Sequence, residues 1–300
     1  MAQTSVIAVA GLGSMGYGIA GSLLRAGNRV HGVDVNAAAM ARFAAEGGAP
    51  GGAAEIAAEI DALVVVVLNA AQTETVLFGP DGWAARMRPG AVILACATVA
   101  PSFAREMGAR AAALGLHYLD APISGGAGKA ASGQLSVMAS GTPAAFAAAR
   151  PALAGMAETV FELGDAPGAG SAMKAVNQLL AGVHIAAMAE AVTFGMTQGV
   201  DPAQTLDVIS KCAGTSWMFE NRAPHIVDGD YTPRSSVNIW PKDLGIVLDI
   251  AREAKFAAPL TAAAMQQFMA AAGSGLGAED DSAVAKVYAR NAGLTLPEGK

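Results

Sequence analysis

A chain of 300 residues, 53% hydrophobic and 15% charged, can bury a large core, so a fibrous or miniature fold is excluded. Its formal net charge of −6 gives no overall positive field for a phosphate backbone, so no nucleic-acid partner is expected. Two cysteines and four histidines that stand apart in the sequence predict neither a disulfide framework nor a metal site.

The first half of the chain alternates short β-rich runs with alanine-rich helical segments, a pattern typical of parallel strands joined by crossover helices. The runs expected as strands are Val6–Ala10, Arg29–Val33, Ala62–Leu68, Ala91–Ala95 and His117–Leu119. Two later runs, Leu135–Gly141 and Thr159–Leu163, are predicted to extend the same sheet. The predicted fold class is therefore α/β, with an N-terminal doubly wound parallel sheet of the Rossmann type.

A glycine-rich turn follows the first predicted strand and leads directly into a helical pattern, Tyr17–Ala26. Its six residues are Gly11, Leu12, Gly13, Ser14, Met15 and Gly16. Between a strand and a helix, such glycines permit a tight turn, close backbone approach to a pyrophosphate and helix-to-strand packing. The alternative is an ordinary glycine-rich loop. We predict that the six residues bind a dinucleotide.

Asp34 closes the second predicted strand, eighteen positions after Gly16. A carboxylate there can accept both ribose hydroxyls of NAD and would repel the extra phosphate of NADP. Neither Val35 nor Asn36 supplies an arginine for that phosphate. The sequence therefore predicts NAD as cofactor, against the alternative that Asp34 is a solvated turn residue.

Two further strand ends are predicted to complete the cofactor site, because ligands of open α/β sheets lie beyond the carboxyl ends of the strands. They are Leu68-Asn69 and Thr98. Each could instead be a turn or cap residue.

The segment Asp120–Gly126 (DAPISGG) follows the fifth predicted strand. Consecutive small residues expose backbone N–H groups, so the turn of Ser124, Gly125 and Gly126 can bind a carboxylate without a positive side chain. A flexible loop is the alternative. The glycine-rich run 164–170 (GDAPGAG) then predicts a break between folding units.

The second half is predicted to be almost entirely helical. Residues Ser171–Gln198 carry apolar residues at helical spacing over many turns and are expected to join the two halves. Further helices are expected at Pro202–Lys211, Asp243–Glu253, Pro259–Ala272 and Ser282–Asn291. The predicted domains are residues 1–165, which bind NAD, and residues 166–300, an all-α domain for substrate and oligomer contacts.

No run approaches the ~18 uninterrupted apolar residues of a membrane span. The N-terminus enters a strand pattern without the features of a signal peptide. A mature cytoplasmic protein without a membrane partner is expected.

Lys174 and Asn177 stand three residues apart near the start of the long helix and so project from one face. A lysine partly removed from water can exchange the proton of a reacting alcohol; a solvated surface charge is the alternative. Lys242-Asp243 is predicted to open a helix after Pro241, where a simple capping pair is equally compatible.

Four ordered motifs together resemble the β-hydroxyacid dehydrogenase family over essentially the full length: GLGSMG, DAPISGG, GSAMKAVNQ and PKDLG. The resemblance implies that Lys174 is the catalytic acid/base and that Asn177 positions a small hydroxy-acid substrate. It further implies that the substrate carboxylate is held by Ser124, Gly125 and Gly126. The nicotinamide side of the cofactor would be lined by Leu68, Asn69, Thr98 and Lys242. A homodimer or homotetramer is expected.

Three longer runs, VNQLLAGVHIAAMAEA, SWMFENRAPHIVDGDYTP and EDDSAV, are similar to the members that oxidise the four-carbon sugar acid L-threonate to its 2-oxo form. The alternatives are members acting on 3-hydroxyisobutyrate or tartronate semialdehyde, a related imine reductase, and a non-catalytic NAD-binding protein. The chain departs from the family at Ala95, Cys96 and Ala97, where an Asp and a Ser often precede the threonine, and at Asn69, where a proline is common.

Overall fold

A computed structural model describes residues 4–299 of the chain. It divides into two compact units, Met1–Lys174 and Ala175–Lys300. The long helix α8 (Ala169–Thr197) therefore belongs to both, its first turns to one and the remainder to the other. The sequence places the domain boundary between residues 165 and 166, just before this helix begins.

The first unit contains the predicted parallel sheet. Its strands are β1 (Val6–Ala10), β2 (Arg29–Val33), β3 (Ala62–Val65), β4 (Val92–Ala95) and β5 (His117–Asp120). They lie in the order β2-β1-β3-β4-β5, and every neighbouring pair is parallel. The direction of winding reverses between β1 and β3, which is where open α/β sheets bind ligands. The predicted doubly wound fold is confirmed.

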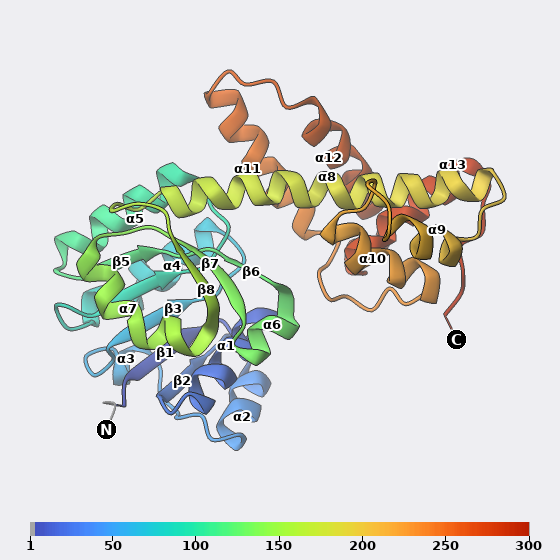
Figure 1. The fold of residues 1–300 in the computed structure, drawn as a ribbon. Helices are drawn as coiled ribbons and strands as arrows, with labels where there is room; N and C mark the ends of the chain where they lie inside the picture. Colours follow the sequence, from blue (N-terminus) through green and yellow to red (C-terminus); the bar gives the residue numbers. More distant parts are fainter. Residues whose placement is uncertain (1–3, 300) are drawn as a thin grey trace. The chain divides into compact units, whose positions relative to one another are not determined.

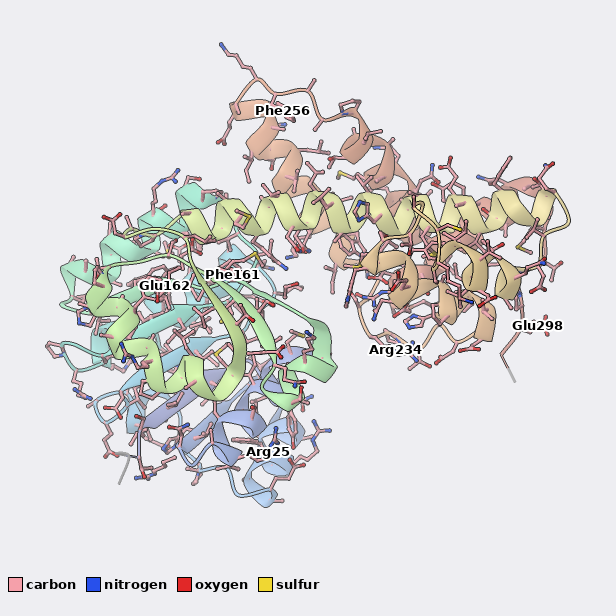
Figure 2. All side chains as sticks on the ribbon, in the orientation of Figure 1. Arg25, Phe161, Glu162, Arg234, Phe256 and Glu298 are labelled. Atoms are coloured by element: carbon pink, nitrogen blue, oxygen red, sulfur yellow. The ribbon has the colours of Figure 1, made fainter. Side chains whose placement is uncertain are left out.

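The expectation that two later strands extend this sheet is wrong. A second sheet has the order β6-β7-β8 and consists of β6 (Ile123–Ser124), β7 (Leu135–Ala139) and β8 (Ala157–Glu162). β5 meets this sheet at the isolated bridge between Asp120 and Ser140, and Pro122, which has no N–H to donate, stands two residues after Asp120. The outer strand β8 ends in the exposed side chains of Phe161 and Glu162 (Figure 2).

Helices cover both faces of the five-stranded sheet (Figure 1). Those of the first unit, besides the start of α8, are α1 (Ser14–Arg25), α2 (Ala37–Ala45), α3 (Ala53–Ile56), α4 (Ala70–Phe78), η1 (Ala84–Arg86), α5 (Pro101–Ala113), α6 (Gly126–Ser132) and α7 (Pro143–Met156).

Strand β1 explains why the sheet strands are continuously apolar. Ile7 and Val9 pack into the core on one face, with residues of α1 and α7. Ala8 and Ala10 pack into the core on the opposite face, with residues of α4 and α5. A parallel strand covered on both faces has no polar side, so simple alternation is absent from its sequence.

Residues 175–299 contain helices and no β-strand, which confirms the prediction of an all-α second half. Besides α8, the helices are α9 (Pro202–Ile209), α10 (Trp217–Asp228), α11 (Ile239–Glu253), α12 (Pro259–Ala271), η2 (Ala272–Leu276), η3 (Asp281–Val284) and α13 (Ala285–Ala292). Helix α11 begins before Pro241, so Lys242 lies inside the helix and does not open it.

Helix α8 is long and apolar enough to cross a membrane by length and composition alone. About 44% of its most hydrophobic window is buried within the protein. It also carries Lys174, Gln178 and Glu190. The core helix of a soluble protein has the same properties, so α8 is weak evidence for a membrane span.

The core of the second unit encloses an acidic cluster. Asp280 accepts hydrogen bonds from the Ser282 hydroxyl (2.7 Å) and the Arg234 backbone N–H (3.0 Å), and its Oδ1 lies 2.7 Å from Nδ1 of His225. Burial by itself raises the pKa of Asp280, but these hydrogen bonds outweigh it and hold the pKa well below its usual range. The adjacent Asp281 binds Arg222 and the Trp240 indole, yet burial raises its pKa.

The lowered pKa of Asp280 predicts a pH-dependent stability difference. A carboxyl whose folded pKa is depressed contributes stability above its unfolded value of about 3.9, and that contribution is lost as the pH falls through the folded value. Asp280→Asn should cost on the order of 3–5 kcal/mol at pH 7, because a buried charged network loses one member. Urea unfolding of the wild type and Asp280→Asn between pH 7 and 3 measures the difference in their free energies of unfolding, which should become smaller as the pH falls. A difference that stays constant would contradict the lowered pKa of Asp280.

Candidate active site

The loops that carry the predicted cofactor residues leave the sheet at one edge. Because β1, β3 and β4 are parallel neighbours, the segments after them, which begin with Gly11, Val66 and Cys96, follow carboxyl ends that lie side by side. The structure therefore brings the glycine-rich turn, Leu68-Asn69 and Thr98 to the same end of the sheet, as the sequence predicts.

Each of the three glycines in the turn is required for a different structural reason. Gly11 has a φ of +99°, and a Cβ there would lie 2.2 Å from the Val66 carbonyl oxygen. A Cβ on Gly16 would lie 1.9 Å from the Gly11 oxygen. Gly13 has an ordinary φ of −69° and nothing within 4 Å of its ideal Cβ position. Gly13 thus leaves open space above the backbone, where a pyrophosphate can approach.

Helix α1 starts at this open position. Gly13 is its N-cap residue, no side chain caps the helix, and its first turn has no acidic residue. The positive end of the helix dipole and the first N–H groups are therefore free to meet an anion. The turn fits the pyrophosphate of NAD.

Asp34 is held rigidly at the end of β2. Its Oδ2 accepts the Leu12 backbone N–H at 2.6 Å, and its Oδ1 accepts the Asn36 backbone N–H at 2.7 Å. The half-buried carboxylate thereby connects the second strand to the glycine-rich turn. Each oxygen retains acceptor capacity for a ribose hydroxyl, so the geometry suits NAD.

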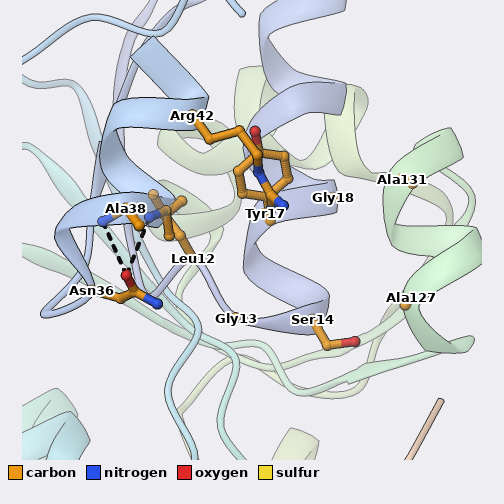
Figure 3. Close-up of a pocket in the computed structure, with 11 residues that line it drawn as sticks. Leu12, Gly13, Ser14, Tyr17, Gly18, Asn36, Ala38, Arg42, Ala127 and Ala131 are labelled. Atoms are coloured by element: carbon orange, nitrogen blue, oxygen red, sulfur yellow. Dashed lines mark hydrogen bonds between the residues drawn. The ribbon is translucent and has the colours of Figure 1, made fainter. Parts of the chain in front are cut away.

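A cavity of about 600 Å³ adjoins the turn (Figure 3). It is lined by Leu12, Gly13, Ser14, Tyr17, Gly18, Asn36, Ala38, Ala39, Arg42, Ala127 and Ala131. The Arg42 guanidinium lies 3.8 Å from the centre of the Tyr17 ring. The two positions after Asp34 carry no arginine, but Arg42, eight residues on and inside α2, brings a guanidinium to this cavity.

The remaining predicted cofactor residues of the first unit have mixed environments. Leu68 is exposed, and Thr98 is half-buried. The Asn69 side chain accepts the Gln72 N–H at 2.9 Å and so caps α4, which is the alternative role given for it above.

Cys96, close to Thr98 in the chain, is buried. Burial, aided by the charge of Asp120, raises the pKa of its thiol to about 12, which makes a nucleophilic thiolate unfavourable.

Lys174 lies beside the predicted carboxylate-binding turn. Its side chain is buried, and its Nζ donates a 2.9 Å hydrogen bond to the carbonyl of Ile123, the residue before Ser124. Gly125 and Gly126 both have positive φ, +132° and +77°, and nothing lies within 4 Å of a Cβ on Gly126. The first unit thus contains a buried amine next to a glycine turn with accessible backbone.

The second unit contains a chain of hydrogen-bonded polar side chains that begins at Asn177. The Asn177 amide donates to Oε1 of Gln178 at 2.9 Å, and the Gln178 amide donates to Asp243. Asp243 in turn pairs with Lys242, with Nζ and Oδ1 2.5 Å apart. Asn177 and Lys242, both predicted from sequence, therefore belong to one network.

Gln178 was missed by sequence reasoning. It is buried and stands four residues after Lys174, so it lies almost directly above the lysine on one face of α8. That spacing was the available signal. Among the described residues no group of three or more His, Cys, Asp or Glu side chains is arranged to hold a metal ion.

Two protein families match the chain. Residues 6–164 match the family described as the NAD binding domain of 6-phosphogluconate dehydrogenase. Residues 168–288 match the family described as NAD-binding of NADP-dependent 3-hydroxyisobutyrate dehydrogenase. Together the matches cover both units.

Full-length relatives are also similar. An L-threonate dehydrogenase of Cupriavidus necator is 54% identical over 97% of each chain. One of Escherichia coli K12 is 46% identical over 98% of this chain and 97% of its own. A crystal structure described as 3-hydroxyisobutyrate dehydrogenase from Salmonella typhimurium superposes with a TM-score of 0.89 at 49% identity, covering 94% of this chain and 99% of the other.

Proposed function

Because the chain belongs to the β-hydroxyacid dehydrogenase family, we propose that it oxidises L-threonate to its 2-oxo acid, 2-dehydro-L-erythronate, using NAD. The observation that carries the proposal is the buried Lys174 amine, 2.9 Å from the Ile123 carbonyl and next to the Ser124-Gly125-Gly126 turn. When bound, NAD supplies the hydride acceptor at its nicotinamide ring.

The protein residues divide the remaining work. Ser124, Gly125 and Gly126 bind the substrate carboxylate through backbone N–H groups and the serine hydroxyl. The neutral Lys174 amine accepts the proton of the reacting hydroxyl group while the C–H bond gives up its hydride. The step would leave the 2-oxo acid and a protonated Lys174, with the hydride taken up by the bound NAD.

Further residues position these groups. Asn177 orients the substrate, supported by its hydrogen bond to Gln178. By family resemblance, the residues proposed for the nicotinamide side of the cofactor site are Leu68, Asn69, Thr98 and Lys242. The common sheet edge supports the first three.

The choice of L-threonate rests on the L-threonate dehydrogenases at 46–54% identity. The Salmonella structure at 49% identity makes 3-hydroxyisobutyrate the competing substrate. Initial rates of NADH formation should give the higher kcat/KM for L-threonate; tartronate semialdehyde with NADH tests the third substrate. A higher kcat/KM for 3-hydroxyisobutyrate would overturn the substrate assignment. NAD binding without turnover of any of the three would instead favour a non-catalytic protein.

Cofactor preference is expected to depend on Asp34. The wild type should prefer NAD, since the carboxylate accepts two ribose hydroxyls and repels a 2′-phosphate. Asp34→Ser should weaken NAD use and improve NADP use, because Arg42 in the adjoining cavity can then pair with the phosphate.

The double variant Asp34→Ser/Arg42→Ala separates the two contributions. It should lose the gain in NADP use that the single variant acquires, as measured by kcat/KM with each cofactor. Comparable wild-type efficiency with NAD and NADP would refute the role of Asp34.

We also propose a cytoplasmic homodimer or homotetramer. Helix α8 carries exposed apolar side chains at Met173, Val176, Leu180 and Phe194, and a second copy of the chain would remove them from water. Light scattering coupled to gel filtration should give two or four times the mass of 29.9 kDa. A monomer at micromolar concentration would contradict it.

A further inference from the structure

A buried carboxylate holds the first turn of α8. Asp120, the last residue of β5, is 1% exposed. It accepts hydrogen bonds from the backbone N–H groups of Gly168 (2.9 Å) and Ser171 (2.8 Å), and from the Ser171 hydroxyl (2.7 Å). The two backbone N–H groups are among the unpaired donors of a helix N-terminus. Asp120 therefore caps α8 from a distant part of the chain.

Ser140 completes this cap. Its hydroxyl accepts the Gly170 N–H at 2.9 Å and lies 3.3 Å from the Asp120 carboxylate, to which it donates. The helix also approaches closely, because a Cβ on Gly170 would lie 2.4 Å from the Met138 carbonyl oxygen and 2.7 Å from that of Asp120. The start of α8 is thus fixed against the ends of β5 and β7.

The same two segments meet again one helical turn later. Lys174 follows Ser171 by three residues, and its Nζ donates to Ile123, which follows Asp120 by three residues. The segment 120–123 therefore holds α8 at two successive points. Loosening the first point shifts the second, since both lie on one short stretch of rigid helix.

We propose that Asp120 is a positioning residue for Lys174: by capping α8 it holds the lysine amine at the Ile123 carbonyl, beside the carboxylate-binding turn. This inference rests on the proposed function, in which Lys174 handles the substrate proton. Asp120 acts through the helix and need not touch the substrate.

A purely structural anchor would not require a charge here. Burial raises the pKa of Asp120, against the opposing hydrogen bonds from Ser171, Gly168 and Ser140, so the carboxylate carries a desolvation cost. A neutral acceptor such as an asparagine carbonyl avoids that cost but offers only one oxygen to the helix donors. The carboxylate accepts hydrogen bonds from several donors of the helix at once, so it specifies the residue at which the helix begins.

The first test measures the position of Lys174 without any substrate. Brief pulses of acetic anhydride at pH 10, near the ordinary lysine pKa, label amines according to their accessibility, and mass spectrometry locates the label. Asp120→Asn should raise the labelling rate of Lys174 about tenfold or more, the factor expected for loss of one charge-assisted hydrogen bond. The exposed Lys211 and Lys255 provide internal references whose rates should stay constant.

A matched control removes an aspartate cap elsewhere. Asp201 caps α9 through the N–H groups of Ala203 (2.8 Å) and Gln204 (3.3 Å), so Asp201→Ala should lower the thermal midpoint while leaving Lys174 labelling unchanged. Should Asp120→Asn not fold, Ser171→Ala removes one bond to Asp120 and should change the labelling in the same direction by a smaller factor. The proposal is overturned if the labelling rate of Lys174 is unchanged in both Asp120→Asn and Ser171→Ala. It is also overturned if Asp201→Ala changes that rate as much as they do.

The second test separates positioning from binding. With L-threonate, Asp120→Asn should lower kcat tenfold or more and leave the KM for NAD within about twofold of wild type. A purely structural loss of folded protein would lower the number of active sites, which active-site titration by NAD binding detects. If the wild type does not oxidise L-threonate, the proposed function fails while the labelling test still decides the role of Asp120.

Discussion

Lys174→Ala is expected to lower kcat for L-threonate by about 100- to 10,000-fold, the usual contribution of a positioned acid/base group. The affinity for NAD should stay near that of the wild type, because the glycine-rich turn and Asp34 bind the cofactor. Steady-state kinetics together with NAD titration by fluorescence checks both expectations.

Three control variants make this result specific. Lys174→Arg should restore little activity, since arginine keeps its charge but is effectively never deprotonated. Lys174→Met preserves the buried aliphatic stem, so it should be as inactive as alanine with less loss of stability. Lys211→Ala, at an exposed position, should behave as wild type. Near-normal turnover by Lys174→Ala or Lys174→Arg would assign the proton transfer to another group.

Gly13→Ala is expected to weaken NAD binding about 10- to 100-fold without unfolding the protein. The free space within 4 Å of its Cβ position and its φ of −69° accommodate a methyl group in the absence of cofactor. With NAD bound, the methyl group would occupy the place where the pyrophosphate approaches the backbone, and forcing an extra carbon into a close contact costs about 1–3 kcal/mol.

Gly52→Ala is the matched control, because Gly52 is also a helix N-cap with φ −99° and nothing within 4 Å of its Cβ position. It should leave NAD binding unchanged. Gly16→Ala should instead destabilise the fold, since its Cβ would lie 1.9 Å from the Gly11 oxygen. Calorimetric titration and thermal unfolding of the three variants separate these effects. If Gly13→Ala binds NAD with wild-type affinity, the pyrophosphate does not approach the backbone at Gly13.

Local patterns in the sequence were sufficient for much of the fold. The five strands of the parallel sheet, the glycine-rich turn and the long helix α8 are each specified by residues close together in the chain. Period and flanking residues therefore predict them. Asp34 is also a local feature, because it directly follows Val33, the last residue of β2, which pairs with Ala10 at the end of β1.

The second sheet could not be predicted in the same way. A β-rich run such as Leu135–Ala139 indicates a strand but not its partner, and pairing with β6 and β8 leaves β5 at the edge of the first sheet. Strand partnership depends on the free energy of contacts between distant segments, which a local pattern does not contain.

Residue types and their spacing identify the groups that could perform the chemistry: a glycine turn for a pyrophosphate, an aspartate for a ribose, a lysine for a proton and a glycine pair for a carboxylate. The folded chain fixes the surroundings of these groups through contacts between distant segments. It placed Arg42 in the cavity beside the turn, joined Gln178 to Asp243, and set Asp120 under the start of α8. Asp120 and Ser171 are 51 residues apart in the chain, and a hydrogen bond over that separation exists only once the core has brought β5 and α8 together.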